Sequence, residues 1–407
     1  MKTGPAASTG SALKIRTELK TRTARAADWP LAGGIVAGVL ADALVGDPRR
    51  GHPVALFGQA ATLIERSIYA DKRTRGAAWS ADWPLAGGIV AGMLADALLG
   101  DPRRGHPVAL FGQAATLLER GMYADSKTRG AAFTACCEAL AIAPALAAAR
   151  LARRAPIAPA PGGARLSRRR PIGQLATAGA FTWAVTGARS LTAEADRIQR
   201  CLLAGDLAGA RRLLPNLCGR DPARLDEAGI ARAVVESVAE NCSDAIVAPL
   251  LWGALAGPLG LAAYRGANTL DAMVGHHSPR YERFGWASAR LDDVANWAPA
   301  RVTALLAAAC APVVGGRAAA TWRLATDYGP RHPSPNAGWC EAAFAGALGV
   351  RLGGPLSYSG RVEHRPELGV GRPPEPADIA RASRLCRAVT AGATALAASM
   401  ALIPTQV

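Results

Sequence analysis

The chain has 407 residues, half of them apolar but only 5% aromatic, with a formal net charge of +16 and a pI of about 10.2. Long Ala, Leu and Gly segments, with almost no alternating Val, Ile and Thr runs, predict a mainly helical protein. The basic residues form short clusters beside apolar runs, not a stripe interleaved with aromatic residues. This pattern argues against nucleic-acid binding and is typical of the loops that flank membrane helices.

An internal duplication dominates the N-terminal third of the chain. The first 26 residues are basic and poor in acidic residues, and we expect a disordered extension there. Residues 27–80 then recur as residues 81–134, with nine differing positions. Solenoid repeats diverge much further and need several copies, so this is a tandem duplication. We expect the second copy, within a unit at 81–150 that runs into the rest of the chain, to be the functional one.

Apolar segments follow one another along the chain, and several reach the 17–20 residues or so that a bilayer helix needs. The predicted spans are Trp29–Gly46, Trp83–Gly100, Ala131–Ala148, Ile172–Leu191, Ala245–Tyr264, Val302–Ala320 and Val389–Ile403. Because Pro249, Gly253, Gly257 and Pro258 interrupt one of them, we expect a re-entrant segment there. The predicted fold class is therefore all-α, a multi-pass membrane protein with polar helical loops. A soluble bundle with buried helices is the alternative.

The C-terminal part is predicted to be a helical membrane core. A Pro/Gly/Arg-rich linker is expected at 151–172, and the core with its polar loops at 173–407. Asp378 lies where a Pro-rich loop enters a helix, a position that favours negative charge. The eight cysteines include no CxxC pair and are expected to be small buried hydrophobic residues.

Four polar clusters interrupt the apolar chain. They comprise Glu236, Glu240, Asn241, Ser243 and Asp244; Arg265, Asn268, Asp271, His276 and His277; Arg290, Asp292, Asp293, Asn296 and Arg301; and His332, Ser334, Asn336 and Glu341. Carboxylates at i, i+4 and i+8 on one helix face repel one another, so a metal ion or another cation is expected to offset the first cluster. Asp292, Asp293 and Asn296 supply the hard oxygens that suit Mg²⁺ bound with phosphate. For any one cluster, a solvated acidic helix edge is the plainer interpretation. No P-loop, GxGxxG or GxSxG motif and no helical zinc pair is present.

These clusters, in this order, resemble the adenosylcobinamide-phosphate synthases, the CobD/CbiB family. The resemblance rests on six ordered segments: DALLGDPRRGHPVALFG (96–112), RAVVESVAENCSDAIVAPL (232–250), YRGANTLDAMVG (264–275), SARLDDVANWAPAR (288–301), HPSPNAGWCEAAFAGALGVRLGGP (332–355) and the YSG that follows. It implies a multi-pass protein of the cell (inner) membrane. The implied reaction joins aminopropanol, or its O-phosphate, to adenosylcobyric acid as an amide, with ATP consumed at a cytoplasmic site.

The resemblance and the chemistry of amide formation together suggest roles for these residues. Arginines and Mg²⁺ would neutralise phosphate, and a base would deprotonate the amine. Expected catalytic residues are Glu236, Glu240, Asn241, Asp244, Asn268 and Asp271. Expected substrate-binding residues are Asp101, His106, Arg265, Arg290, Arg301, Ser334, Asn336 and Glu341. Expected Mg²⁺ ligands are Asp292, Asp293 and Asn296, and ATP is implied without any nucleotide motif. The expected partners are the corrinoid, the aminopropanol compound, membrane lipid and other cobalamin-assembly enzymes, without nucleic acid.

Two other functions stay open at the sequence level. A transporter would use intramembrane carboxylates such as Asp42 and Asp96. The sequence DDVAN also loosely resembles the aspartate-rich motif of Mg²⁺-dependent diphosphate enzymes, although a second such motif is missing. Transporter repeats are often inverted, whereas this repeat is tandem and confined to one end.

Overall fold

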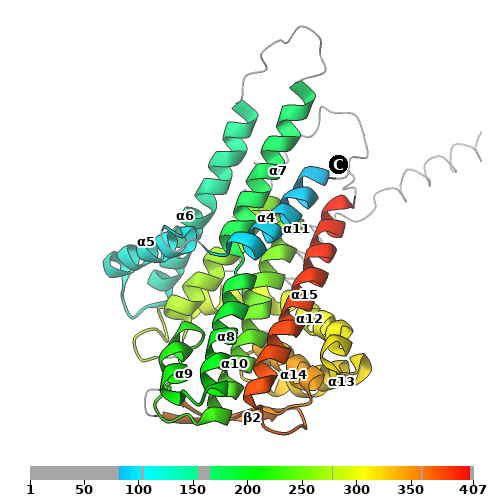
Figure 1. Cartoon of the computed structure of the whole chain (residues 1–407). Coiled ribbons are helices and arrows are strands. Elements are labelled where there is room, and N and C mark those ends of the chain that lie inside the picture. Colours follow the sequence, from blue (N-terminus) through cyan, green and yellow to red (C-terminus); the bar gives the residue numbers. More distant parts are fainter. Residues whose placement is uncertain (1–81, 102–104, 155–165, 277, 359–360, 404–407) are drawn as a thin grey trace, which may run out of the picture. The chain divides into compact units, whose positions relative to one another are not determined.

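The computed structural model describes residues 82–101, 105–154, 166–276, 278–358 and 361–403. Within them the chain is mostly helical (Figure 1). The helices are α4 (Trp83–Leu99), α5 (Pro107–Met122), α6 (Lys127–Arg154), α7 (Leu166–Val185), α8 (Ala188–Leu203), α9 (Leu207–Leu213), α10 (Glu227–Cys242), α11 (Ala248–Leu270), α12 (Trp286–Cys310), α13 (Ala318–Tyr328), α14 (Ala337–Leu348) and α15 (Pro376–Leu402). The extension at 1–26 and the first repeat copy at 27–80 lie outside the described residues.

Four helical stretches of the described residues are long and apolar enough to cross a membrane. They are Lys127–Leu151, Glu227–Gly275, Trp286–Val314 and Pro376–Leu402, and the shorter apolar helix is Trp83–Leu99. The expectation of an all-helical, multi-pass membrane protein is thereby confirmed. The one feature that it missed is a two-stranded antiparallel hairpin, β1 (Leu352–Tyr358) and β2 (Arg361–Leu368).

Several predicted boundaries were wrong. The apolar run predicted at 172–191 is cut after Val185, and α8 starts a new direction at Ala188. The run predicted at 302–320 ends earlier, because a 3₁₀ turn and Gly315, with φ of +82°, follow α12. The segment 288–301, expected within a polar stretch between spans, belongs to the long apolar stretch Trp286–Val314 as the first half of α12. These errors share one cause, since hydropathy does not detect helix ends inside apolar sequence.

The stretch from 243 to 275 turns back on itself at Gly257. This glycine has φ of +60° and ψ of −147°, a conformation that other residues rarely adopt. A Cβ on Gly260 would lie 2.1 Å from the carbonyl oxygen of Trp252, whereas residues eight apart on a straight helix are separated by about 12 Å. The expected interruption of this span is confirmed as a hairpin of two antiparallel arms with Gly257 at its tip, and its re-entry into a bilayer stays a prediction.

Helix α4 packs along this hairpin and against α7 and α15 (Figure 1). Two glycines allow the close approach to α7, because a Cβ on Gly88 would lie 2.5 Å from that of Ala178, and one on Gly92 would lie 2.5 Å from that of Thr182. At the other end of α4, the Asp96 carboxylate accepts a hydrogen bond from the backbone N–H of Arg189 at 3.1 Å. The second repeat copy thus supplies a helix that is packed on one side, with Leu94, Leu98 and Leu99 exposed on the other.

The largest cluster of buried apolar side chains centres on α10, with contributions from α8, α14 and α15. The first turn of α15 is fixed by a reciprocal capping box between Glu375 and Asp378. Arg372 and Arg381 both bind the Asp378 carboxylate, each at 2.7 Å. The expectation that Asp378 occupies a helix start is confirmed.

Candidate functional site

Helix α10 carries the carboxylates of the first polar cluster into two different surroundings. Every residue from 233 to 239 is buried, and Glu240 is the one exposed side chain between 233 and 248. Asn241 is half-buried and donates from Nδ2 to the Ser237 carbonyl at 2.9 Å. Glu240 is therefore the exposed residue of this stretch, and its carboxyl group lies within electrostatic range of Arg365, Arg220 and Glu236.

Glu236 is buried and has two strong donors. One carboxylate oxygen accepts from the Arg220 guanidinium, and the other accepts from the Gly353 N–H of β1 at 2.6 Å. Arg232, one turn earlier on α10, donates to the Gly353 carbonyl at 2.8 Å. The Glu236 carboxylate thus ties the loop before α10 and the β-hairpin to the helix, which is a positioning role.

Glu341 of α14 lies in the same region and is 2% exposed. Its pKa is raised well above the ordinary value of 4.5, first by burial and then by the nearby Glu236 and Glu240 carboxylates. The Arg220 and Arg365 guanidiniums oppose that rise. Together these five groups form what we call the glutamate cluster: Glu236, Glu240, Glu341, Arg220 and Arg365.

A second group of carboxylates converges where the two arms of the hairpin meet α12. Asp244 lies within electrostatic range of Glu240, Asp271 and Asp292. We call these four carboxylates the acidic cluster. The segments Ser243–Val247 and Asp271–Gly275 are both π-helical, so Asp244 and Asp271 each sit in a distortion of a kind that often marks functional sites.

Arg265 is the cation of the acidic cluster. It donates to Asn268 at 3.3 Å, and Asn268 donates in turn to Asp292 at 3.3 Å. The Arg265 Nε is buried without a hydrogen-bond partner. Across the two clusters, which share Glu240, six carboxyl groups face three guanidiniums, an excess of acidic groups that a bound cation would offset.

Asp101 and His106 lie at the end of α4 and the start of α5. Their side chains approach to 3.9 Å, and the His106 Nδ1 accepts from the Val108 N–H and caps α5. Burial lowers the pKa of His106; Asp101 opposes that effect and Arg265 adds to it. The two residues are therefore close enough to Arg265 to belong to the same site.

The loop before α14 reaches α12 through polar contacts. The Ser334 hydroxyl accepts from the Asn336 and Ala337 N–H groups, and the Asn336 Nδ2 donates to the Asp293 carbonyl at 2.8 Å. Arg301 donates to the Asn336 Oδ1 at 3.0 Å, and its guanidinium also lies over the rings of Trp297 and Trp339. In this arrangement Ser334, Asn336 and Arg301 lock the loop to α12.

The three expected Mg²⁺ ligands lie next to one another on α12. Asn296 and Asn268 both hydrogen-bond the Asp292 side chain, and Asp293 lies within electrostatic range of it. Asp293 also forms an ion pair with the exposed Arg290 at 3.1 Å, and the buried Asn296 accepts from the Tyr264 hydroxyl at 2.9 Å. Across the described part of the chain, no three His, Cys, Asp or Glu side chains form a group that could hold a metal ion by themselves. Mg²⁺ stays a proposal, and it would need oxygen ligands from a bound phosphate.

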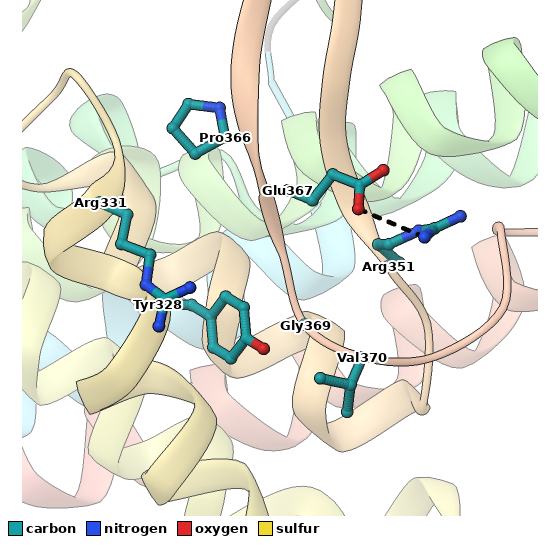
Figure 2. Close-up of a pocket in the computed structure, with 7 residues that line it drawn as sticks. All are labelled: Tyr328, Arg331, Arg351, Pro366, Glu367, Gly369 and Val370. Atoms are coloured by element: carbon teal, nitrogen blue, oxygen red, sulfur yellow. Dashed lines mark hydrogen bonds and ion pairs between the residues drawn. The ribbon is translucent and has the colours of Figure 1, made fainter.

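A separate surface pocket of about 520 Å³ lies between the end of α13 and strand β2 (Figure 2). In it the Arg351 side chain reaches Glu367 at 3.3 Å, and the Arg331 guanidinium lies 4.2 Å from the centre of the Tyr328 ring. None of the residues predicted from the sequence lines this pocket. We therefore place the candidate site at the two carboxylate clusters.

Sequence reasoning missed two cations of the glutamate cluster, Arg220 and Arg365. The segment CGRDP, which contains Arg220, indicates only a helix break in the sequence. The sequence pointed to these cations only indirectly, because three carboxylates on one helix face need a cation nearby. Nothing in the local sequence shows that Arg365 reaches the site from a β-strand.

Fold and site together define a multi-pass helical membrane protein with an acidic, arginine-containing site at the base of a hairpin. The family model described as CobD/Cbib protein matches residues 89–386. The chain belongs to the CobD/CbiB family. The matched range begins inside the second repeat copy.

Curated relatives extend the similarity over most of the chain. The chain is 50% identical over 310 residues to the cobalamin biosynthesis protein CobD of Mycobacterium tuberculosis, covering 76% of this chain and 94% of that protein. It is 42% identical over 302 residues to the protein of the same name from Chromobacterium violaceum, covering 72% and 89%. No solved structure matches the chain.

Proposed function

We propose that this protein forms the amide bond between aminopropanol, or its O-phosphate, and a propionate carboxyl of adenosylcobyric acid, with consumption of ATP. Family membership and the names of the relatives support a role in cobalamin biosynthesis. The observation that carries the reaction is the placement of Glu240. This residue is exposed on α10, and its carboxyl group lies within electrostatic range of both charged clusters, each of which contains an arginine.

The chemistry requires an activated carboxyl group and a neutral amine. Transfer of the ATP γ-phosphoryl group to the corrinoid carboxylate gives an acyl phosphate and ADP. The amine nitrogen then attacks the acyl carbon, the C–N bond forms, the C–O bond to phosphate breaks and inorganic phosphate leaves. The proton lost by the amine must go to a base, and Glu240 is the accessible carboxylate for that task.

The remaining residues of the site bind the substrates and orient the reacting groups. Arg265, with its buried and unpartnered Nε, is suited to hold a phosphate oxygen, and Asn268 orients it toward Asp292. Asp244, Asp271 and Asp292 would hold Mg²⁺ together with phosphate oxygens, and the bound metal would offset the phosphate charge. Glu236 holds Gly353 and Arg220 in place, so it supports the site without touching substrate.

The test uses membranes that contain the full chain, with adenosylcobyric acid, aminopropanol phosphate or aminopropanol, and MgATP, followed by mass spectrometry of the amide. Product is expected only with protein, ATP and Mg²⁺ present. Glu240→Gln is expected to lower turnover about 10²–10⁴-fold, the usual contribution of a general base. Folded protein that makes no amide from either amine under these conditions would overturn the proposal.

A pair of neighbouring substitutions tests the predicted metal ligands. Asp292→Asn removes a member of the acidic cluster, and Asp293→Asn removes the partner of the exposed Arg290. We expect a larger rise in the Mg²⁺ concentration for half-maximal activity in Asp292→Asn. Equal effects would make both residues ligands, as the sequence predicts.

A transporter receives no support from Asp96. Its carboxylate is 1% exposed and binds the first turn of α8, so it is occupied by a structural contact. A diphosphate enzyme would need a second aspartate-rich motif, and the sequence offers none.

A further inference from the structure

The surface pocket of about 520 Å³ outside the two carboxylate clusters has the lining of a ligand site (Figure 2). Tyr328 and Arg331 line it from the end of α13, and Arg351, Glu367 and Val370 line it from the β-hairpin and its flanks. We call it the α13–β2 pocket. Its volume lies within the range of about 300–1,000 Å³ that small-molecule and cofactor sites occupy.

The charges of the α13–β2 pocket suit an anion, because two guanidiniums face one carboxylate. Arg331 donates from Nε to the Asp327 carbonyl at 2.9 Å, and among the described residues no carboxylate pairs with it. Arg351 pairs with Glu367 at 3.3 Å, with side chains 43% and 56% exposed. Such a surface pair contributes little to stability, so a phosphate can take Arg351 from Glu367. Guanidiniums bind phosphate oxygens through charge-assisted hydrogen bonds.

The same pocket offers faces for a flat ring. The Arg331 guanidinium lies 4.2 Å from the centre of the Tyr328 ring. Val370 is apolar yet 72% exposed, and it follows Gly369, whose φ of +97° favours glycine. Nucleobases stack on aromatic rings and on guanidinium planes. A carboxylate such as that of Glu367 is the group that accepts hydrogen bonds from ribose hydroxyls in dinucleotide sites. Base, ribose and phosphate thus each find a matching group.

The α13–β2 pocket adjoins the glutamate cluster along both of its sides. Pro366 lines the pocket, and Arg365 of the cluster precedes it on β2, where successive residues are about 3.3 Å apart. On the other side Arg331 is followed by His332, whose Nε2 lies 3.4 Å from the Arg365 Nη1. Arg365 in turn lies within electrostatic range of Glu240. A ligand longer than the pocket therefore meets Arg365 and then Glu240.

We propose that the α13–β2 pocket binds the nucleoside end of ATP, with the base against Tyr328, the ribose hydroxyls on Glu367 and the first phosphates on Arg331 and Arg351. The terminal phosphate then extends past Arg365 toward Glu240. This inference rests on the proposed function, which consumes ATP. It gives a nucleotide site to a chain that has no P-loop or GxGxxG motif.

Photolabelling of the purified full chain in detergent locates the base directly. The probe is 8-azido-ATP with Mg²⁺, and mass spectrometry of peptides identifies the labelled residues. We expect adducts within residues 328–331 and 366–370 that excess ATP prevents. ATP-protected adducts confined to other segments would overturn the pocket and leave the proposed function intact. Folded protein without any ATP-protected adduct would overturn both.

Substitutions in the pocket should act on ATP alone. In the amide assay we expect Tyr328→Ala to raise the KM for ATP about 5–150-fold, the usual loss for one stacked base, and Tyr328→Phe, which keeps the ring, to leave it unchanged. Arg351→Ala should also raise the KM for ATP, whereas Arg323→Ala, at an exposed arginine of α13, should not. The KM values for the corrinoid and the amine should stay at the wild-type level.

Two outcomes of these kinetics would count against the pocket. A rise in the KM for the amine, and not for ATP, would assign the α13–β2 pocket to the amine donor. An unchanged KM for ATP in both Tyr328→Ala and Arg351→Ala, with amide still formed, would place the nucleotide elsewhere in the protein.

Discussion

Arg220 and Glu236 form an ion pair that is buried at both ends, with side chains 7% and 3% exposed. The pair joins the loop before α10 to the buried face of that helix, and the second Glu236 oxygen joins the helix to β1. The Glu236 carboxylate, which the sequence suggested for catalysis, thus holds together the loop before α10, α10 itself and β1. The open Glu240, one turn further along α10, is left for chemistry.

Breaking this pair from one side should be costly. Arg220→Met leaves the Glu236 charge buried without its main partner, and we expect a loss of about 3–5 kcal/mol in the free energy of unfolding. The double variant Arg220→Met with Glu236→Gln should recover much of that loss. Thermal denaturation of the purified protein in detergent measures both. A single variant as stable as the wild type would show that the pair contributes nothing.

Glu341 should make stability depend on pH. Its pKa is raised in the folded protein by burial and by Glu236 and Glu240, so the folded state holds its proton more tightly than the unfolded chain does. The stabilising contribution is complete below pH 4.5 or so and declines as the pH rises toward the folded pKa, by up to about 1.4 kcal/mol per pH unit.

The variant Glu341→Gln cannot lose a proton there. The melting temperature of the variant minus that of the wild type should therefore increase from pH 5 to pH 8. The control is Glu367→Gln, because Glu367 is exposed. An unchanged difference across that range would mean that Glu341 has an ordinary pKa.

Asp96 should contribute to stability as a helix cap. Asp96→Ala removes the acceptor of the Arg189 N–H and should cost about 0.5–2 kcal/mol, whereas Asp96→Asn keeps an acceptor and should cost less. Detergent melting curves compare the two variants. If Asn and Ala destabilise equally, the charge of Asp96, and not its hydrogen bond, is what matters.

Gly130 of α6 lies where the core has no room for a side chain. A Cβ on it would lie 1.8 Å from the Phe284 carbonyl oxygen, so Gly130→Ala should destabilise the protein by about 1–3 kcal/mol. Gly121 of α5 has no atom within 4 Å of an added Cβ, and Gly121→Ala is the control with almost no expected effect. Equal melting temperatures of the two variants in detergent would contradict the prediction.

The sequence predicted the helical membrane class, and it singled out acidic and amide residues that the fold brings together. These residues stand out against Ala-rich helices, and Pro249 to Pro258 marked the turn of the hairpin. The sequence could not show contacts between distant segments, such as those of Tyr264 with Asn296 and of Asn268 with Asp292.

Helix ends inside apolar sequence were also beyond prediction. The break after Val185 depends on the Gly187 N–H bonding to the Ala245 carbonyl of a distant helix at 3.3 Å. The β-hairpin was missed because its strands are short and rich in Gly, Pro and Arg, and it is held partly by Gly353 bonding to Glu236. Such contacts become visible only after the fold has brought the segments together.

The reversal at Gly257 also bears on how the protein would be inserted into a membrane. Asp244 at the base of the first arm and Asp271 at the base of the second lie at the same end of the hairpin, within electrostatic range of each other. A segment that enters a bilayer and turns back has both ends on one side, so with the tip in the bilayer neither aspartate would have to be translocated. Each acidic residue carried to the bilayer centre would cost about 2.5–3.5 kcal/mol during insertion. A hairpin of this kind would let the acidic cluster assemble without moving its charges through lipid.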